Sequence, residues 1–282
     1  PTAANGGSQL LGGTQATVDS TNIVGVLRYK MDNGFGVHGG IRSSRASADV
    51  TLSGRAYGAL SGYSASLDTS TAYGWLAGAS YERPDIALRV ALTYNSPVTH
   101  KFDTVETIPG AIAPLFGVPG DTPIPTGTTE VTTPRAWNLD VQTGVAADTL
   151  VFGGIRWVKW SEFKVRPPLF SRIPGQADGL VSLEDTTTYT LGVGRKFTDQ
   201  WSGAASVSWE PKGDDLVSPL APTNGRVGMT LAAIYTVDNM KITTGINYTK
   251  LGDANPETAG MAQADMTGNS GLGIGVKIGM SF

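Results

Sequence analysis

The side chains that most often carry catalysis are scarce in this sequence. It has two histidines, His38 and His100, and no cysteine, and it lacks the G-x-S-x-G motif of a serine nucleophile. A serine nucleophile needs a base placed beside it, and no pattern in the chain supplies one. Gly34, Gly36 and Gly39 match the G-x-G-x-x-G dinucleotide fingerprint, but they lead from a predicted turn into a strand, whereas the fingerprint opens a helix. We therefore predict no enzyme activity and no cofactor.

Metal and nucleic-acid chemistry are no better supported. Acidic residues in predicted loops, such as Asp214, Asp215, Asp253 and Glu257, carry the oxygen ligands that Ca²⁺ prefers. Such residues are also common in solvated loops, so we predict no metal site. A formal net charge of -3 offers no positive surface for nucleic acid.

Two segments, 53–70 and 107–129, carry apolar side chains among turn-forming residues and could bind a hydrophobic ligand. In the first segment the apolar residues are three to four positions apart, which predicts one face of a short helix. The candidate binding residues are Tyr57, Leu60, Tyr63, Leu67, Ile112, Leu115, Phe116 and Val118. Exposed apolar patches often mark binding sites, but the same residues could simply pack the two loops together.

Alternation of apolar and small or polar residues identifies the elements that must position these groups. In the last thirteen residues, 270–282, Leu272, Ile274, Val276 and Ile278 alternate with glycine and lysine. A period of two places all the apolar side chains on one face of a β-strand. Such a strand is typical of a membrane barrel, which meets lipid on its outside and water in its lumen, although a strand of a soluble sandwich would look the same.

Segments with a period of two recur along the whole chain. No run approaches the roughly 18 consecutive apolar residues of a transmembrane helix. Eleven strands are predicted, at residues 23–31, 35–52, 71–83, 86–106, 130–146, 150–166, 186–197, 200–210, 226–237, 240–251 and 270–282.

The connections between these strands are short and long in strict alternation. The long connections are residues 53–70, 107–129, 167–185, 211–225 and 252–269. Transmembrane barrels have short periplasmic turns and longer outer loops, whereas a sandwich has no reason to sort its loops in this way. The predicted fold is all-β, a transmembrane antiparallel β-barrel.

Strand direction predicts that part of the barrel wall is missing from the sequence. The first and eleventh predicted strands both run from the long-loop end to the short-turn end, so pairing them would be parallel. Bacterial single-chain barrels are antiparallel with an even number of strands. Residues 1–21 are rich in small polar residues and predict a loop. We therefore expect an odd number of further strands before residue 1.

Three short segments resemble a known family. They are ALTYNS at residues 91–96, PRAW at 134–137 and WSEF at 160–163. In their order and spacing they resemble the outer-membrane transporters of long-chain fatty acids and aromatic hydrocarbons, the FadL/TodX type. The likeness extends from about residue 23 to residue 282.

This resemblance implies a fourteen-stranded barrel with an N-terminal hatch in the lumen. Residues 1–282 would then form a single β-barrel domain that lacks the hatch and the first three strands. The implied function is passive transport of a hydrophobic small molecule across the bacterial outer membrane by a monomer surrounded by lipid and lipopolysaccharide. The apolar residues of the first two long loops would form the entry groove.

Charged residues that face the lumen are the other candidates for substrate binding. Taking Trp157 as lipid-facing places Lys164 inside. Between Ile41 and Ala46 the apolar residues change from odd to even positions. A β-bulge between them would explain this change and turn Arg45 inward. Arg45 and Lys164 could then hold a fatty-acid carboxylate, or such charges could pair with one another or with the hatch.

The alternative function is that of a general diffusion porin for small polar solutes. Porins usually have an acidic constriction loop and a strongly charged lumen, whereas charged residues make up 16% of this chain and its first two long loops are apolar. A purely structural or adhesive barrel is the third possibility.

Overall fold

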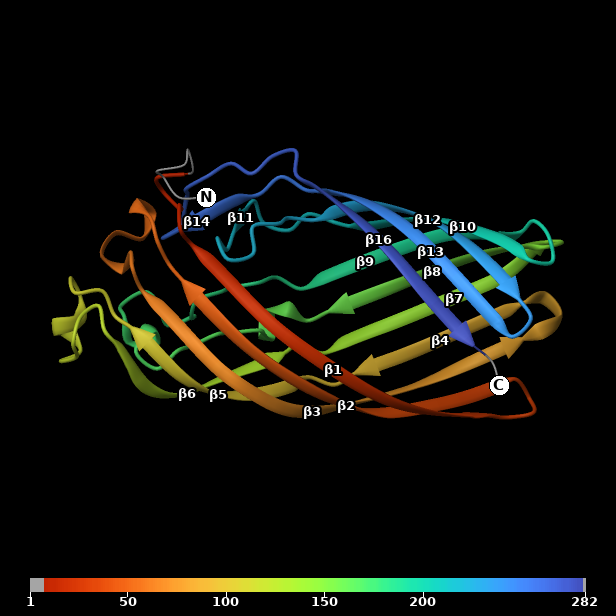
Figure 1. Cartoon of the computed structure of the whole chain (residues 1–282), viewed down its shortest axis with the longest axis horizontal. Helices are drawn as coiled ribbons and strands as arrows, with labels where there is room; N and C mark the ends of the chain where they lie inside the picture. Colours follow the sequence, from red (N-terminus) through yellow and green to blue (C-terminus); the bar gives the residue numbers. More distant parts are fainter. Residues whose placement is uncertain (1–7, 281–282) are drawn as a thin grey trace.

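One large antiparallel sheet dominates residues 8–280, the part of the chain that the structure, a computed structural model, describes. Eleven strands follow one another along it in chain order, as predicted. They are β1 (Gln15–Lys30), β2 (Phe35–Thr51), β3 (Ser64–Arg83), β4 (Leu88–Asn95), β7 (Ala136–Ala146), β8 (Thr149–Val158), β9 (Thr186–Lys196), β10 (Trp201–Glu210), β12 (Arg226–Val237), β13 (Met240–Leu251) and β16 (Ser270–Met280). Figure 1 shows these strands as a curved, tilted wall, with the long connections at one end and the short turns at the other.

Two predicted strands are each interrupted at a proline. The predicted strand 86–106 is divided into β4 and β5 (Val98–Thr107) around Pro97, and the strand 130–146 into β6 (Pro123–Thr133) and β7 around Pro134. Proline has no N–H to donate to a strand ladder. β3 nevertheless pairs with both parts in the same register, with β4 towards the short turns and with β5 towards the long loops. The β5–β6 hairpin therefore extends the wall at its long-loop end (Figure 1).

Two strands begin earlier than their composition predicts. β1 starts at Gln15, within a segment predicted to be a loop, and pairs with β2 along its whole length. β3 starts at Ser64, seven residues before the predicted start at residue 71. In both cases a long partner strand offers backbone hydrogen-bond partners, and these override the weak strand propensity of small polar residues. The predicted loop residues 1–7 and the last two residues of the predicted strand 270–282 lie outside the described part.

The outward face of the wall is apolar and exposed. Leu27 is 84% exposed, Ile41 75% and Ile274 74%, which is the arrangement expected where side chains meet lipid. No helix among the described residues is long and apolar enough to cross a membrane.

Aromatic side chains form a row near each end of this outward face. Towards the long loops, Tyr94 lies between Trp75 and Trp137, with ring-centre distances of 5.3 and 4.9 Å. Near the short turns, Trp201 packs against Tyr235 at 4.9 Å. Two such rows are typical of the aromatic girdles that lie at the membrane–water interfaces.

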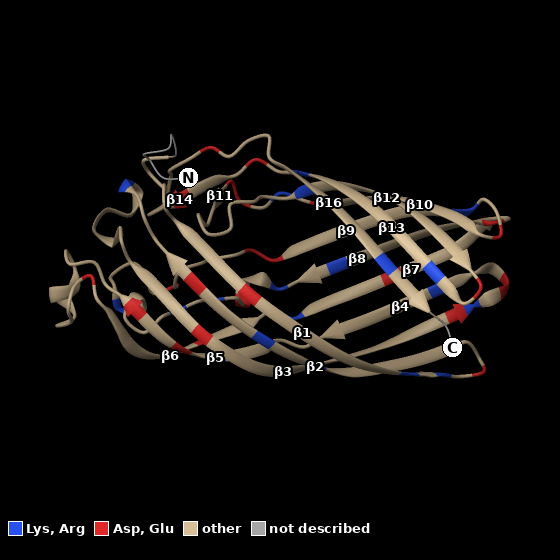
Figure 2. Cartoon of the chain, in the orientation of Figure 1, with Lys and Arg blue, Asp and Glu red and all other residues tan. Residues whose placement is uncertain are grey.

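The two ends of the sheet do not pair with each other in the described part of the chain. β1 and β16 both run towards the short-turn end, so a direct pair between them would be parallel. At the long-loop end, β11 (Leu216–Val217), β14 (Asn255–Thr258) and β15 (Met261–Ala262) form a small separate sheet. Figure 2 shows that charged residues are widely spaced along the strands.

Candidate functional site

A buried apolar cluster lies where β2, β3 and β5 continue beyond the outer aromatic row and meet the long loops. We call it the loop-end core. Its buried members are Val50, Leu52, Tyr63, Ala65, Leu67, Phe102, Ile108, Ala113, Val131, Leu169, Phe170 and Leu180. Apolar residues from strands, loops and the β5–β6 hairpin therefore share one packed interior at the end of the barrel that carries the long loops.

The structure brings most of the predicted binding residues together at this core. Tyr63 and Leu67 are buried in it, whereas Tyr57, Ile112, Phe116 and Val118 are partly buried and pack against it. The segments 53–70 and 107–129 thus meet as expected, and most of the predicted side chains pack the loops together. Their role in substrate binding stays a prediction.

Two predicted residues lie away from the core. Leu60 is half-buried in a short 3-10 helix, η2 (Arg55–Leu60). Leu115, the last residue of the short 3-10 helix η4 (Ala113–Leu115), is 77% exposed. Leu115 is therefore the predicted residue best placed to meet a ligand that arrives from solution.

The predicted single helix face from Tyr57 to Leu67 is wrong. η2 is interrupted at Gly58, whose φ of 53° is not helical, and it ends before Tyr63. Leu67 lies in β3. Spacings of three and four residues indicated a helix, but the backbone conformation at Gly58 and pairing with β2 decide the structure of this segment.

Glu106 is the central polar group of the loop-end core, and the sequence analysis did not single it out. Its side chain is fully buried. Its Oε1 accepts hydrogen bonds from the Tyr63 hydroxyl at 2.8 Å and from the Phe170 N–H at 2.9 Å, and its Oε2 accepts one from the Leu169 N–H at 2.9 Å. The alternation within β5 was the available signal, since Glu106 shares a strand face with buried Phe102.

These hydrogen bonds join three separate parts of the chain. Burial and the adjacent Glu106 carboxylate raise the pKa of Tyr63 above its ordinary value, so the phenol keeps its proton and donates it. The Tyr63 ring also packs on Phe170 at 4.8 Å. A buried charged group is costly unless it is fully hydrogen-bonded, and here Glu106 fastens the third long loop to β5 and to the loop before β3.

The prediction that Arg45 faces the lumen is wrong. The β1–β2 register is continuous, with no bulge near residues 43–44. Arg45 is exposed and shares the outward face of β2 with Ile41. The apolar residues at even positions, such as Val50, face inward because β2 has left the lipid layer there and packs into the loop-end core.

The predicted strand position of Lys164 is also wrong. β8 ends at Val158, so Lys164 lies in the long loop that follows, where its Nζ donates to the Ser182 hydroxyl at 3.2 Å. Glu162, in the same loop, accepts two hydrogen bonds from the Arg135 guanidinium, at 2.7 and 3.0 Å. The alternation of apolar and polar residues continues by coincidence from β8 into this loop, up to residue 166.

Two other arginines face the lumen. Arg42, on β2, donates to the Ser96 carbonyl at 3.1 Å, and its buried Nε has no partner among the described residues. Arg156, on β8, donates to the Asn138 side-chain oxygen at 2.7 Å. This pair of cations on the interior wall is suited to an anionic group, and the assumed bulge led the sequence analysis to Arg45 in place of Arg42.

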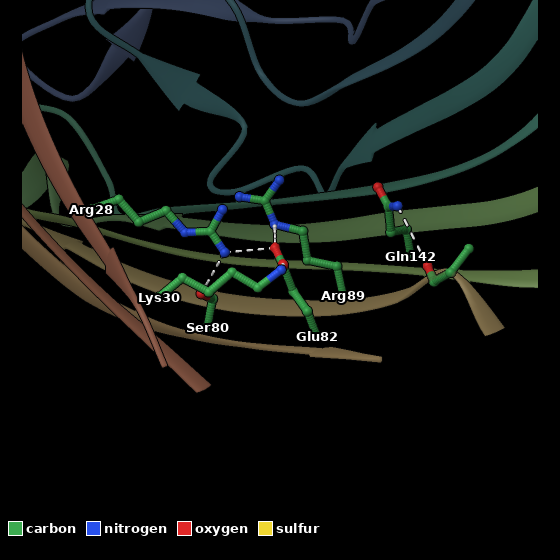
Figure 3. A network of polar contacts seen from close by, with 7 residues as sticks. Arg28, Lys30, Ser80, Glu82, Arg89 and Gln142 are labelled. Carbon is green, nitrogen blue, oxygen red and sulfur yellow. Dashed lines mark hydrogen bonds and ion pairs between the residues drawn. The ribbon is translucent and has the colours of Figure 1, made fainter. Parts of the chain in front are cut away.

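A second cationic cluster lies on the inner face near the short turns (Figure 3). Glu82 accepts from Arg28 at 2.6 Å and from Lys30 at 2.9 Å, and Arg89 lies 3.4 Å away. The Arg28 guanidinium also donates to the Ser80 hydroxyl at 3.3 Å. One carboxylate thus faces three cations from β1 and β4, which leaves a net positive charge on this part of the wall.

The histidines do not form a catalytic arrangement within residues 8–280. His38 contacts the Thr93 hydroxyl at 2.9 Å, and His100 contacts the Ser44 hydroxyl at 3.2 Å. No group of three histidine or acidic residues in the described part is arranged to hold a metal ion. In the loops, Asp253 and Glu257 instead accept hydrogen bonds from backbone N–H groups.

The family of the chain follows from its sequence match. Residues 6–278 match the family described as outer membrane protein transport protein (OMPP1/FadL/TodX). The chain belongs to this family. As a member of the OMPP1/FadL/TodX family it is an outer-membrane protein, and its family is one of transport proteins. A comparison with curated proteins gives no match.

Solved structures of the OMPP1/FadL/TodX family share the fold. A FadL homologue from Pseudomonas aeruginosa has a TM-score of 0.66 and 18% identity, over 93% of this chain and 66% of that one. The toluene transporter TodX of Pseudomonas putida has a TM-score of 0.57 and 12% identity, over 85% and 65%. The toluene transporter TbuX of Ralstonia pickettii has a TM-score of 0.56 and 11% identity, over 83% and 63%. The chain thus spans about two thirds of the length of these structures.

Proposed function

We propose that this protein carries hydrophobic compounds, either long-chain fatty acids or aromatic hydrocarbons, passively across the outer membrane. The observation that carries the proposal is the apolar character of the long loops, which build the buried loop-end core and leave Leu115 77% exposed on their surface. Apolar molecules gain roughly 25 cal/mol per Å² on leaving water, so an apolar surface there favours their capture. Membership of a family of outer-membrane transport proteins supports the same function.

The charged groups of the lumen bear on the substrate class. TodX and TbuX are toluene transporters, which favours an aromatic hydrocarbon. The Arg42 and Arg156 guanidiniums favour a substrate with a carboxylate, because charge-assisted hydrogen bonds to a carboxylate are strong. A carrier of fatty acids accounts for both the apolar loops and the cations on the wall.

We propose further that the protein works as a monomer and that an odd number of strands joins β1 to β16. Antiparallel closure needs an odd number because both strands run the same way. Polar residues such as Asp49 and Lys101 face outward on the long-loop side of the outer aromatic row. They would lie at the level of the lipopolysaccharide head groups. The Ser44–His100 contact does not support an enzymatic role, because the His100 Nδ1 has no partner among the described residues that would orient the ring as a base.

Displacement of a fluorescent long-chain fatty acid from the purified protein in detergent tests this function. Oleate and toluene are the competitors, and a small polar sugar is the control. Saturable displacement by either hydrophobic compound, with no effect of the sugar, is the expected result. Channel conductance for small ions without any saturable binding would instead make the protein a porin.

The Leu115→Asn variant is expected to bind the fatty acid about fivefold more weakly. The reason is that an exposed leucine contributes on the order of 1 kcal/mol when a ligand covers it. Met261→Asn is the matched control, since Met261 is also an exposed apolar residue but lies in a different long connection, 252–269, which is not one of the two predicted capture loops. Equal affinities for the two variants would show that Leu115 takes no part in capture.

A further inference from the structure

A hollow of about 880 Å³ lies on the lipid-facing surface of the wall, across strands β8, β9, β10, β12, β13 and β16 (Figure 1). Its volume is within the range of roughly 300–1,000 Å³ that is usual for sites of small molecules. Its lining is mainly apolar and includes Thr149, Arg195, Phe197, Gly203, Ala233 and Ile274. We call it the outer recess.

The strand register places the outer recess outside the barrel. Directly opposite residues of an antiparallel sheet point to the same face. The outward residue Ile274 lies opposite Ile246, and the row continues across the wall through Leu231, Ala205 and Val193. The next outward row, two residues nearer the short turns, consists of Thr244, Ala233, Gly203, Arg195 and Thr149. The outer recess is therefore separate from the lumen.

Small residues form the floor of the outer recess. Gly203 and Ala233 lie opposite each other on β10 and β12. The Phe197 ring lies over Gly203, 2.8 Å from the position that a Cβ atom would take, so a larger residue there would displace the ring. Leu231 and Ile246 stand on the side away from the short turns. The recess thus has one aromatic wall and one aliphatic wall, a shape that an alkyl chain can fill.

Arg195 brings a positive charge to this apolar surface. Its side chain is exposed and has no carboxylate partner within residues 8–280. The guanidinium donates to the Thr149 hydroxyl at 3.4 Å. The next residue, Lys196, is by contrast paired with Asp199 at 2.7 Å. The remaining N–H groups of Arg195 can therefore bind an anion from the surroundings of the barrel.

The position of Arg195 along the wall indicates which anion it meets. Phe197, two residues later, donates its N–H to the Trp201 carbonyl, and Trp201 belongs to the aromatic row near the short turns. Two strand residues span roughly 7 Å, a distance over which an arginine can extend its guanidinium to the membrane surface. Short turns of such barrels face the periplasm, and the periplasmic leaflet of the outer membrane is made of phospholipid. The anions at this level are phosphodiesters.

We propose that the outer recess binds one phospholipid of the periplasmic leaflet, with an acyl chain over Gly203 and Ala233 and its phosphate on the Arg195 guanidinium. Arginine matches the geometry of phosphate oxygens with its forked N–H groups, and an arginine without a partner on the lipid face of a barrel is costly. The inference goes beyond the proposed function, because this site lies outside the barrel and involves no transported compound.

Native mass spectrometry of the full protein, released from a neutral detergent, tests the proposal. Phosphatidylglycerol is titrated in, and diacylglycerol with the same acyl chains and inorganic phosphate are the comparison ligands. One saturable phosphatidylglycerol adduct is expected, with weaker retention of diacylglycerol and no displacement by inorganic phosphate. Adducts that do not saturate, equal retention of diacylglycerol, or displacement of the lipid by inorganic phosphate would each overturn the proposal.

Two pairs of variants locate the binding. Arg195→Gln is expected to weaken phosphatidylglycerol binding about tenfold and to leave diacylglycerol unchanged. Arg83→Gln is its matched control, since Arg83 lies at the same end of the wall but pairs with Asp85 at 2.7 Å. Ala233→Phe is expected to fill the recess and abolish saturable binding. Ala79→Phe, at an exposed alanine on the outward face of β3, is its control. Equal effects within either pair would contradict the proposed site.

Discussion

The Glu106→Ala variant is expected to lose about 3–5 kcal/mol of unfolding free energy and to release the third long loop. The substitution leaves the Tyr63 hydroxyl and the N–H groups of Leu169 and Phe170 without an acceptor in a buried site. Each buried donor left unsatisfied costs about 1–3 kcal/mol. Urea unfolding of the purified protein in detergent measures the total, and hydrogen exchange at Leu169 and Phe170 reports the local opening.

Graded and control variants make this prediction specific. Glu106→Gln keeps one acceptor oxygen, and Tyr63→Phe removes only one donor, so both are expected to cost less than Glu106→Ala. Glu130→Ala is the matched control, because Glu130 is an exposed carboxylate that pairs only with exposed Lys101 at 3.0 Å. If the Glu106→Ala protein were as stable as the Glu130→Ala protein, Glu106 would not hold the loop-end core together.

The Val207→Arg variant is expected to insert poorly into bilayers, with a loss of about 2–4 kcal/mol. Val207 lies on the outward face of β10, about half exposed, between the aromatic residues Trp201 and Trp209 of the same strand. An arginine on the lipid face of a barrel costs this much at the bilayer midplane. The yield of folded protein in lipid vesicles, followed by its electrophoretic mobility, measures the effect.

Ser206→Arg supplies the matched control on the same strand. Ser206 faces the opposite side of β10, towards the lumen, where a charge can be hydrated. We expect this variant to fold nearly as well as the unaltered protein. Equal yields for Val207→Arg and Ser206→Arg would contradict the assignment of the outward face to lipid.

The repeating pattern of the sequence was sufficient to predict the barrel wall. A period of two is a direct consequence of strand geometry, so each of the eleven predicted strands overlaps a strand of the wall, and the alternation of short and long connections was correct. The ends of the strands were less predictable. The polar start of β1 becomes a strand because β2 is long enough to pair with it, and this depends on contacts between segments rather than on local composition.

The candidate site was predictable in its apolar part and less so in its charged part. The loops that carry Tyr57 and Phe116 do meet at one core, because clustered apolar residues must be buried somewhere. The orientation of Arg45 was predicted wrongly because the change of the apolar residues from odd to even positions was attributed to a bulge. The change arises because the first part of β2 faces lipid with its odd positions, whereas its last part packs its even positions into the loop-end core. Glu106 was missed because its importance depends on donors more than sixty residues later in the chain.

Uptake by intact cells is the most direct test of the central claim. The full protein would be expressed in a Gram-negative host that lacks its own carriers of this kind, and entry of labelled oleate and of a small labelled sugar would be measured in parallel. We expect saturable oleate uptake, weakened in the Leu115→Asn variant, with no gain in sugar entry. Faster entry of the sugar with unchanged oleate uptake would contradict it and establish a channel for polar solutes.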